Sequence, residues 1–327
     1  MITKKYKNWI KIQRNKQKIK IKITKISELD KWKLDKIKLS HLSKKFFKII
    51  GINIKTNFFT KGWDQPIIKQ NEVGILGIIK NDKENKYLLQ AKIEPGNINK
   101  LQLSPTVQAT KSNYSVVHGG KKVLFLNFFL KKQKFKSFQS EQAFRYYNKQ
   151  NANIIFHTNK KIQTADQFMW FKKEEIYFLL KKKNLINMDT LSVFSCFVKK
   201  RSFDKPLNSL KGINDWVLKN DTKYFLKTKI KELSKLKEWK ITNEKIYHKN
   251  NNFFSIIGLN VVSNTREVNK WSQPIIKGKN MSLAGFIMKD FNNTRHYLCR
   301  YILKPGSKKS TISCTVNTSD IDNYKNL

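Results

Sequence analysis

Apolar positions in the first part of the chain predict strands. The apolar runs Ile75–Lys80 and Tyr87–Ile93 lie on either side of the polar stretch NDKENK, and this arrangement predicts a β-hairpin. Further on, Lys122–Leu130 (KVLFLNFFL) is a continuous apolar run, which predicts a strand buried on both faces. We therefore expect a sheet in this part of the chain.

Two later segments predict helices. Ser140–Gln150 (SEQAFRYYNKQ) opens with a serine that suits an N-cap. In Lys172–Lys183 the apolar residues Ile176, Leu179 and Leu180 fall on one helical face, and Asn184 suits a stop. Strands followed by helices favour an α+β unit.

An internal repeat organises the whole chain. Five segments recur in the same order at offsets of 207 to 210 residues, beginning with Phe46–Ile54, which returns as Phe253–Val261. At this offset the partner of His118 falls on the last residue, so we expect an incomplete second copy. The predicted organisation is a basic N-terminal arm (1–24), a first unit with the main site (25–205) and a second, truncated and degenerate unit (206–327).

The formal net charge of +44 admits two interpretations. A polyanion partner would be neutralised by clustered Lys and Arg. Only six of these residues are Arg, however, and the abundant Lys, Ile, Asn and Phe all have A/T-rich codons, which favours composition drift. No motif of a nucleic-acid reader occurs, so we expect no specific nucleic-acid partner.

Other classes of protein are disfavoured by what the sequence lacks. The three cysteines form no CxxC pair, so neither a disulfide framework nor a zinc site is indicated. We find no signal peptide and no apolar run of roughly 18 residues, and expect a cytoplasmic protein without a membrane span. No GxGxxG follows a strand, so we expect no redox cofactor, and we expect no metal.

Amide, hydroxyl and carboxylate groups are concentrated in a few segments. These are Gln90–Asn97, Gln102–Gly120, Gln139–Gln142 and Asn187–Asp189. Such a density of donors and acceptors suits recognition of a sugar.

These segments resemble a known family. WDQPII, LLQAKIEPGN, QLSPTVQATKSNY, VHGG, QSEQ and NMDTLSVFSC, with Gly74 and Gly77, are similar to the signature run of the NDP-hexose 2,3-dehydratase family. The resemblance covers about Trp32–Cys196 and, in degenerate form, Trp239–Leu327. It implies Nudix-like units, a homodimer, and action on a dTDP-4-keto-6-deoxyhexose in deoxysugar biosynthesis. Its labile diketo product would require an NAD(P)H-dependent 3-ketoreductase.

The implied reaction needs a proton acceptor, a proton donor and an oxyanion site. A C4 ketone acidifies the C3 hydrogen, and donors must stabilise the resulting enolate before the C2 hydroxyl leaves. We predict His118 and Glu94 for proton transfer, in either role, and Lys92 and Tyr114 at the developing oxyanion. The alternatives are a turn histidine, a turn carboxylate and, for Lys92 and Tyr114, surface or packing side chains.

A wider set of polar residues is predicted to bind the substrate. Trp63 could stack on thymine, although Trp271 fills the same place in the second copy, which favours packing. Likewise Gln90, Glu94 and Gln108 correspond to Arg300, Lys304 and Asn317, so the second copy's site is predicted to be altered. The predicted binding residues are Trp63, Gln65, Gln90, Asn97, Gln102, Ser104, Thr106, Gln108, Thr110, Asn113, Glu141, Gln142, Asn187 and Asp189.

Two other hypotheses stay open. A catalytically inactive, truncated relative would at most bind a nucleotide sugar. A basic nucleic-acid-binding protein would bind duplexes at ~200 mM salt.

Overall fold

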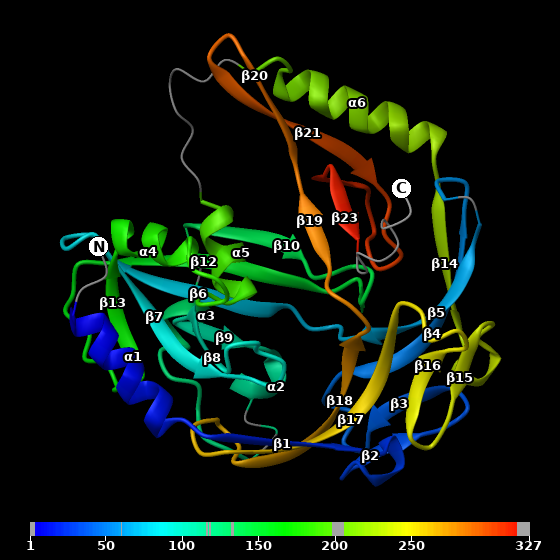
Figure 1. Ribbon diagram of the computed structural model, residues 1–327, viewed down its shortest axis with the longest axis horizontal. Coiled ribbons are helices and arrows are strands. Elements are labelled where there is room, and N and C mark those ends of the chain that lie inside the picture. The colour runs from blue at the N-terminus through cyan, green and yellow to red at the C-terminus, as the bar shows by residue number, and fades with distance from the viewer. Residues whose placement is uncertain are drawn as a thin grey trace.

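The computed structural model describes residues 4–59, 61–115, 117, 119–131, 134–197 and 206–318 (Figure 1). The chain is α+β, with mostly antiparallel sheets and few helices, as the order of predicted strands and helices indicated. Among the residues described, no helix is both long enough and apolar enough to cross a membrane.

A seven-stranded sheet forms the centre of the first half. The predicted hairpin is confirmed, because β6 and β7 pair antiparallel up to Asn81 and Lys86. β12 lies parallel to β6 on its other side and pairs with β10, while β13 and β8 flank β7. The strands are β6 (Gly74–Asn81), β7 (Lys86–Ile93), β8 (Leu101–Pro105), β9 (Val107–Ala109), β10 (Lys136–Ser140), β12 (Gln150–Thr158) and β13 (Phe168–Lys172).

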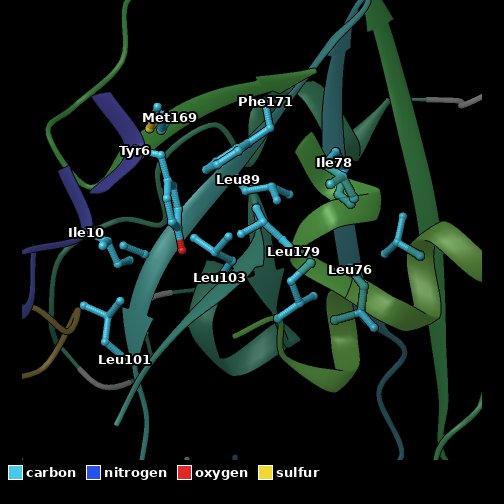
Figure 2. Packing of buried hydrophobic residues seen from close by; sticks show 14 of the residues in the cluster. Tyr6, Ile10, Leu76, Ile78, Leu89, Leu101, Leu103, Met169, Phe171 and Leu179 are labelled. Carbon is cyan, nitrogen blue, oxygen red and sulfur yellow. The ribbon is translucent and has the colours of Figure 1, made fainter. Parts of the chain in front are cut away.

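Helices cover one face of this sheet. Tyr6 and Ile10 of α1 pack against Phe171 and the apolar side chains of β7 and β8, as Figure 2 shows. Leu179 of α4 packs in the same apolar cluster. The N-terminal residues are thus part of a core, and the boundaries of the three predicted segments remain predictions. The helices are α1 (Lys4–Lys16), α4 (Lys173–Leu180) and α5 (Met188–Ser195).

The predicted helix Lys172–Lys183 is confirmed as the shorter α4. Ile176 and Leu179 are buried, whereas Leu180 is 36% exposed. Asn184 adopts a left-handed conformation with φ of 54°, which an asparagine tolerates after a helix.

The strand predicted over Lys122–Leu130 is wrong. This segment instead contains the short helix α3 (Asn127–Leu130), and Phe129 packs over the second face of the central sheet. None of the residues 122–130 lies in a strand, and Leu126 and Phe129 are buried in the cluster on this face of the sheet. The apolar run therefore covers the sheet and does not extend it.

The helix predicted over Ser140–Gln150 is also wrong. β10 ends at Ser140, the chain turns, and the two-residue strand β11 (Tyr146–Tyr147) lies beside another sheet. Gly306, far along the sequence, donates its N–H to the Ala143 carbonyl and accepts from the Asn148 N–H, each at 2.7 Å. Tertiary partners satisfy these backbone groups, so a helical ladder is not needed.

Two smaller sheets have matching element order. In the first half β2 (Trp32–Leu34), β3 (Lys38–His41), β4 (Lys48–Thr56) and β5 (Trp63–Lys69) form an antiparallel series. The second half repeats the series with β15 (Trp239–Ile241), β16 (Lys245–His248), β17 (Phe254–Ser263) and β18 (Lys270–Gly278). Single turns of 3-10 helix precede each series, η1 (Ile26–Glu28) and η2 (Leu233–Lys235).

The two halves exchange a strand. β1 (Ile19–Thr24) pairs with β17 of the second half, and β14 (Leu226–Lys231) pairs with β4 of the first (Figure 1). The registers correspond, because Thr24 pairs with Gly258 while its repeat counterpart Lys231 pairs with Gly51. We call this arrangement the strand exchange.

Tryptophans extend the strand exchange into a shared core. The Trp32 indole donates to the Ser272 carbonyl at 2.9 Å, and the counterpart Trp239 donates to the Asp64 carbonyl at 2.8 Å. Both rings are buried in one apolar cluster that draws side chains from both halves. Both halves therefore contribute side chains to this one core.

The remaining second-half strands are more exposed. β20 and much of β21 have exposed side chains, whereas their counterparts β6 and β7 are largely buried. Helix α6 (Leu210–Lys223) contacts β21 through Trp216 and Asp221 but has no buried residue of its own. The strands are β19 (Leu283–Gly285), β20 (Ile287–Phe291), β21 (Thr294–Ile302), β22 (Thr311–Cys314) and β23 (Val316–Thr318).

Candidate functional site

A cavity of about 1740 Å³ lies between the two halves. First-half strands, the turn after β10 and the start of α5 line it together with residues of β17, β18 and the loop between them. Ten of the predicted site residues line this cavity: Trp63, Gln65, Lys92, Glu94, Gln108, Thr110, Asn113, Glu141, Gln142 and Asp189.

Four side chains form an ionic cluster on the cavity wall. Glu94 lies 3.2 Å from the Lys92 ammonium and 3.2 Å from the Arg266 guanidinium. Lys92 also donates to the Gln108 side-chain oxygen at 3.2 Å, and the Gln108 amide nitrogen lies 3.4 Å from both Glu94 oxygens. Three of these residues come from β7, the turn after it and β9, and Arg266 comes from the second half. We call them the Glu94 cluster.

The Glu94 cluster keeps its carboxylate charged. Burial by itself would raise the pKa of Glu94, but the Lys92 and Arg266 cations and two hydrogen bonds outweigh it and lower this pKa to about 2. Burial and the nearby Arg266 charge lower the pKa of Lys92. The cluster is thus a fixed anion held between two cations.

The loop that carries Arg266 is attached to the first half. The Asn264 side chain donates to the Lys16 carbonyl at 2.8 Å and accepts from the Lys18 N–H at 2.9 Å. On its other side, the Lys121 N–H donates to the Glu267 carbonyl at 2.8 Å. The position of Arg266 is therefore fixed by contacts with both α1–β1 and the segment before α3.

Asp189 lies in the first turn of α5. Asn187 caps this helix by accepting from the Thr190 N–H at 2.9 Å, and its amide donates to Ser104 at 2.9 Å. Burial and the negative charges of Glu94 and Glu141 raise the pKa of Asp189 to about 7. The cavity thus holds one carboxylate that stays ionised and one carboxyl group that titrates near neutrality.

Six predicted binding residues do not line the cavity. Gln102 donates to the Asn184 carbonyl at 3.0 Å, and Asn97 donates to the Lys100 carbonyl at 3.1 Å. Thr106 bridges β6 and β7 by accepting from the Ile79 N–H at 3.0 Å and donating to the Leu88 carbonyl. Gln90 lies within β7, while Ser104 and Asn187 hold α5 as described above. Substrate contacts by these six residues remain predictions.

Two predicted catalytic residues cannot be placed in the site. His118 lies outside the described residues. The backbone of Tyr114 ends the four-residue helix α2 (Lys111–Tyr114), which Thr110 and Asn113 cap. Their roles remain predictions.

Sequence reasoning missed many polar residues of the cavity, among them Arg145, Lys149, Asn151 and Arg266. Arg145 lies with its guanidinium 4.1 Å from the Phe254 ring centroid, and burial lowers its pKa to about 10. Lys149 donates to the Glu72 carbonyl at 2.6 Å, and Asn151 donates to Glu141 at 2.6 Å. Arg266, described above with Glu94, is another of these residues. The available signal was the rarity of arginine, since two of the six arginines in the chain line this cavity.

Trp63 makes the same local contact as its counterpart. Its indole donates to Gln65 at 2.7 Å, and the Trp271 indole donates to Gln273 at 3.2 Å. Gln65 in turn donates to the Phe144 carbonyl at 2.8 Å. The tryptophan–glutamine pair therefore fixes the turn after β10 in the first half.

The cavity combines features needed for acid–base chemistry on a large polar ligand. Its carboxyl groups have pKa values pushed in opposite directions, which is the usual arrangement for separate proton-transfer and charge-stabilising roles. Cationic side chains suited to phosphate or enolate oxygens lie in the same wall.

Comparison with known proteins agrees with this chemistry. The family model of NDP-hexose 2,3-dehydratase matches residues 3–197 and 210–327. A protein of Saccharopolyspora spinosa named dTDP-4-dehydro-6-deoxy-alpha-D-glucopyranose 2,3-dehydratase is 31% identical over 324 residues, covering 88% of this chain and 67% of the relative. Proteins with the same name from Streptomyces violaceoruber and Amycolatopsis orientalis are 32% and 29% identical, covering 87% and 96% of this chain and 69% and 71% of theirs. The chain therefore belongs to the NDP-hexose 2,3-dehydratase family.

Proposed function

We propose that this chain removes water across C2 and C3 of a dTDP-4-keto-6-deoxyhexose. The observation that carries the proposal is the family match over both halves of the chain. The name of the three relatives identifies the gluco-configured 4-dehydro-6-deoxy sugar as their substrate. We take the same substrate for this chain.

The cavity supports the chemistry of this elimination. Removal of the C3 proton leaves an enolate at the C4 oxygen, which a cation can stabilise. Lys92 is a buried cation on the cavity wall, so we assign it to this oxygen. The product after loss of water is an enol, which becomes a 3,4-diketo sugar by gaining a proton at C2 and losing the one on O3.

The diphosphate of the substrate needs its own cations. Arg145 is stacked on Phe254 and forms no ion pair with a carboxylate in the part of the chain that the structure describes. A planar guanidinium held in this way suits bidentate contacts to phosphate oxygens. We assign the diphosphate to Arg145.

The finer features implied by the family resemblance belong to the same proposal. These are Nudix-like units, a homodimer, a cytoplasmic location and coupling to an NAD(P)H-dependent 3-ketoreductase. A 3,4-diketo sugar is labile, so an enzyme that reduces it promptly would protect the product. Light scattering on the purified chain tests the dimer.

The function is tested by incubating the chain with dTDP-4-keto-6-deoxyglucose, with and without a 3-ketoreductase and NADPH. Mass spectrometry is expected to show a product lighter by one water, trapped as the reduced 2-deoxy sugar. Unchanged substrate with cooperatively melting protein would leave the inactive, ligand-binding relative as the better description.

A further inference from the structure

The carboxyl groups that line the cavity differ in whether they have a hydrogen-bond or ion-pair partner in the protein. Four of the five bind protein donors: Asp64 accepts from Lys231 at 2.6 Å, Glu94 from Arg266 at 3.2 Å and Glu141 from Asn151 at 2.6 Å, while Glu238 lies 3.5 Å from Lys249. Asp189 has no hydrogen-bond or ion-pair partner within the described ranges. Its carboxyl group is thus available to a ligand.

The surroundings of Asp189 are built from fixed groups. Asn187 and Ser104 hold the start of α5, so the backbone that carries Asp189 is anchored in the sheet. The charged and titratable groups around its carboxyl are Glu94, Glu141 and Lys92, and the buried Tyr146 hydroxyl, whose pKa burial and the Glu141 and Asp189 charges raise. Two fixed anions beside one carboxyl favour its protonated form, and the Lys92 cation opposes them.

We propose that Asp189 exchanges the proton with the sugar, and that Glu94, held by Lys92 and Arg266, acts as a fixed charge that sets its basicity. This inference rests on the dehydratase function proposed above. Glu94 is poorly suited to accept a proton itself, because two cations stabilise its charged form. A pKa near neutrality, as at Asp189, is the better match for a group that must both take and give a proton.

A single carboxyl group can serve both halves of the elimination. In a gluco-configured ring the C3 hydrogen and the C2 hydroxyl project from the same face. The Asp189 carboxylate takes the C3 proton, and the C–H electron pair forms the enolate at C4. The enolate collapses to the ketone, forms the C2–C3 double bond and expels the C2 oxygen, which receives that proton and leaves as water. Asp189 is again a carboxylate.

Arg266 is a positioning residue in this arrangement. It holds Glu94 in place from the second half of the chain and does not need to touch the sugar. The second half therefore contributes to proton transfer at a site whose other members come from the first half.

The test compares wild-type protein with Asp189→Asn, Glu94→Gln and Arg266→Gln over pH 5 to 9. Wild-type kcat/KM is expected to rise with a midpoint near pH 7 and to level off above about pH 8, because Asp189 must be ionised to accept the proton. Asp189→Asn is expected to lower kcat by roughly 10²- to 10⁴-fold and to remove this rise. Glu94→Gln removes a neighbouring negative charge and is expected to move the rise to lower pH.

An activity-independent readout accompanies the kinetics. Carboxyl ¹³C NMR of aspartate-labelled protein is expected to show a titration near pH 7 that is absent in Asp189→Asn and moves to lower pH in Glu94→Gln. Arg266→Gln unpairs Glu94 on one side, so the titration midpoint of Asp189 is expected to change, whereas Arg266→Lys restores it in part. The control is Asp215→Asn, an exposed carboxylate in α6 outside the cavity, which should leave both the kinetics and the titration unchanged.

Failure of the inference and failure of the function are separable. Wild-type protein that melts cooperatively but releases no water from the sugar refutes the dehydratase function and, with it, the catalytic role of Asp189. Wild-type protein that is active while folded Asp189→Asn retains turnover and the same pH dependence overturns the inference alone. A carboxyl titration of Asp189 below pH 5 overturns it as well.

Discussion

The two halves of this molecule share a strand series but differ in the residues around the cavity. β2–β5 and β15–β18 follow the same order and pair in corresponding registers. The Glu94 cluster has no second version, because Lys92, Glu94 and Gln108 correspond to Ile302, Lys304 and Asn317. Similar packing therefore coexists with different chemistry.

This difference separates the residues that the fold requires from the residues that the cavity chemistry requires. The strand series of each half packs against that of the other in one core and completes the strand exchange, so both copies are needed for the fold. Only one set of cavity groups is needed for proton transfer, and the second half contributes Arg266 to it. A repeat can thus preserve its architecture in both copies and its site in one.

The largest effect is expected from giving the first half the residue of the second. Glu94→Lys places a third cation beside Lys92 and Arg266 and should destabilise the protein by about 3–5 kcal/mol, because buried charges lose their partner. Turnover should fall roughly 10³-fold, because a cation in place of Glu94 lowers the basicity of Asp189, the proton-transfer group. Thermal melting and product mass spectrometry measure both effects. The control Glu174→Lys makes the same charge change in the exposed first turn of α4 and should cost at most about 1 kcal/mol with unchanged turnover, so an equal loss there would contradict a local cause.

A smaller loss is expected at the ion pair that joins the halves. Asp64 accepts from Lys231 at 2.6 Å and from the Lys237 N–H at 2.8 Å, with a side chain only 1% exposed. Asp64→Asn should cost about 3 kcal/mol in urea unfolding at pH 7. The exposed Asp290→Asn is the matched control and should leave the midpoint unchanged.

The Asp64 pair also predicts a pH dependence. Burial would raise the pKa of Asp64, but bonds from Lys231, Asn53 and the Lys237 N–H lower it below the ordinary value. A lowered folded-state pKa stabilises the protein above about pH 4 and stops doing so as the pH falls through the folded value. Wild-type stability should therefore drop more steeply below pH 4 than that of Asp64→Asn, and parallel curves would contradict this.

The strand exchange can be tested with a single methyl group. A Cβ at Gly51 would lie 2.6 Å from the Lys231 carbonyl oxygen and 2.8 Å from Leu236 Cδ2. Gly51→Ala should push β14 from β4 and cost about 1–3 kcal/mol. At Gly285 no atom lies within 4 Å of the added carbon, so Gly285→Ala should be close to neutral. Similar losses from both in denaturant titration would refute the steric explanation.

The smallest effect compares two helix caps. Asn187 caps α5 from a buried position and also binds Ser104, whereas Ser209 caps the exposed α6 by accepting from the Gly212 N–H at 3.0 Å. Asn187→Ala should cost about 1–2 kcal/mol and Ser209→Ala about 0.5 kcal/mol. Hydrogen exchange of the amides within each helix measures the loss of local stability. A larger loss for Ser209→Ala than for Asn187→Ala would contradict the explanation that the buried cap contributes more.

Local patterns predicted the elements whose partners are close in sequence. The hairpin of β6 and β7 follows from a polar turn between apolar runs, and α4 follows from helical spacing of Ile176 and Leu179. The segments 122–130 and 140–150 were misassigned because distant partners decide them. One packs over a face of the central sheet through Leu126 and Phe129, and the other is fixed by Gly306.

The candidate site shows the same division. Lys92, Glu94 and Gln108 were predicted because they fall in short segments dense in polar groups. Arg266 could not be assigned to them, because only the folded loop after β17 brings it to Glu94. Asp189 was predicted to bind substrate, but its neighbours Glu94 and Glu141 are far from it in the sequence. The sequence pattern could not predict that residues far apart in the chain lie close together in the folded cavity.

The strand exchange also affects how the chain folds during synthesis. β1 is complete at Thr24, but its partner β17 begins only at Phe254. At about 5–20 residues per second the ribosome needs roughly 10–50 s to make that interval. During this time the edge of β1 has no partner from its own chain, and a neighbouring nascent chain on the same messenger could supply one. Faster elongation between these strands should therefore favour monomeric folding over interchain exchange.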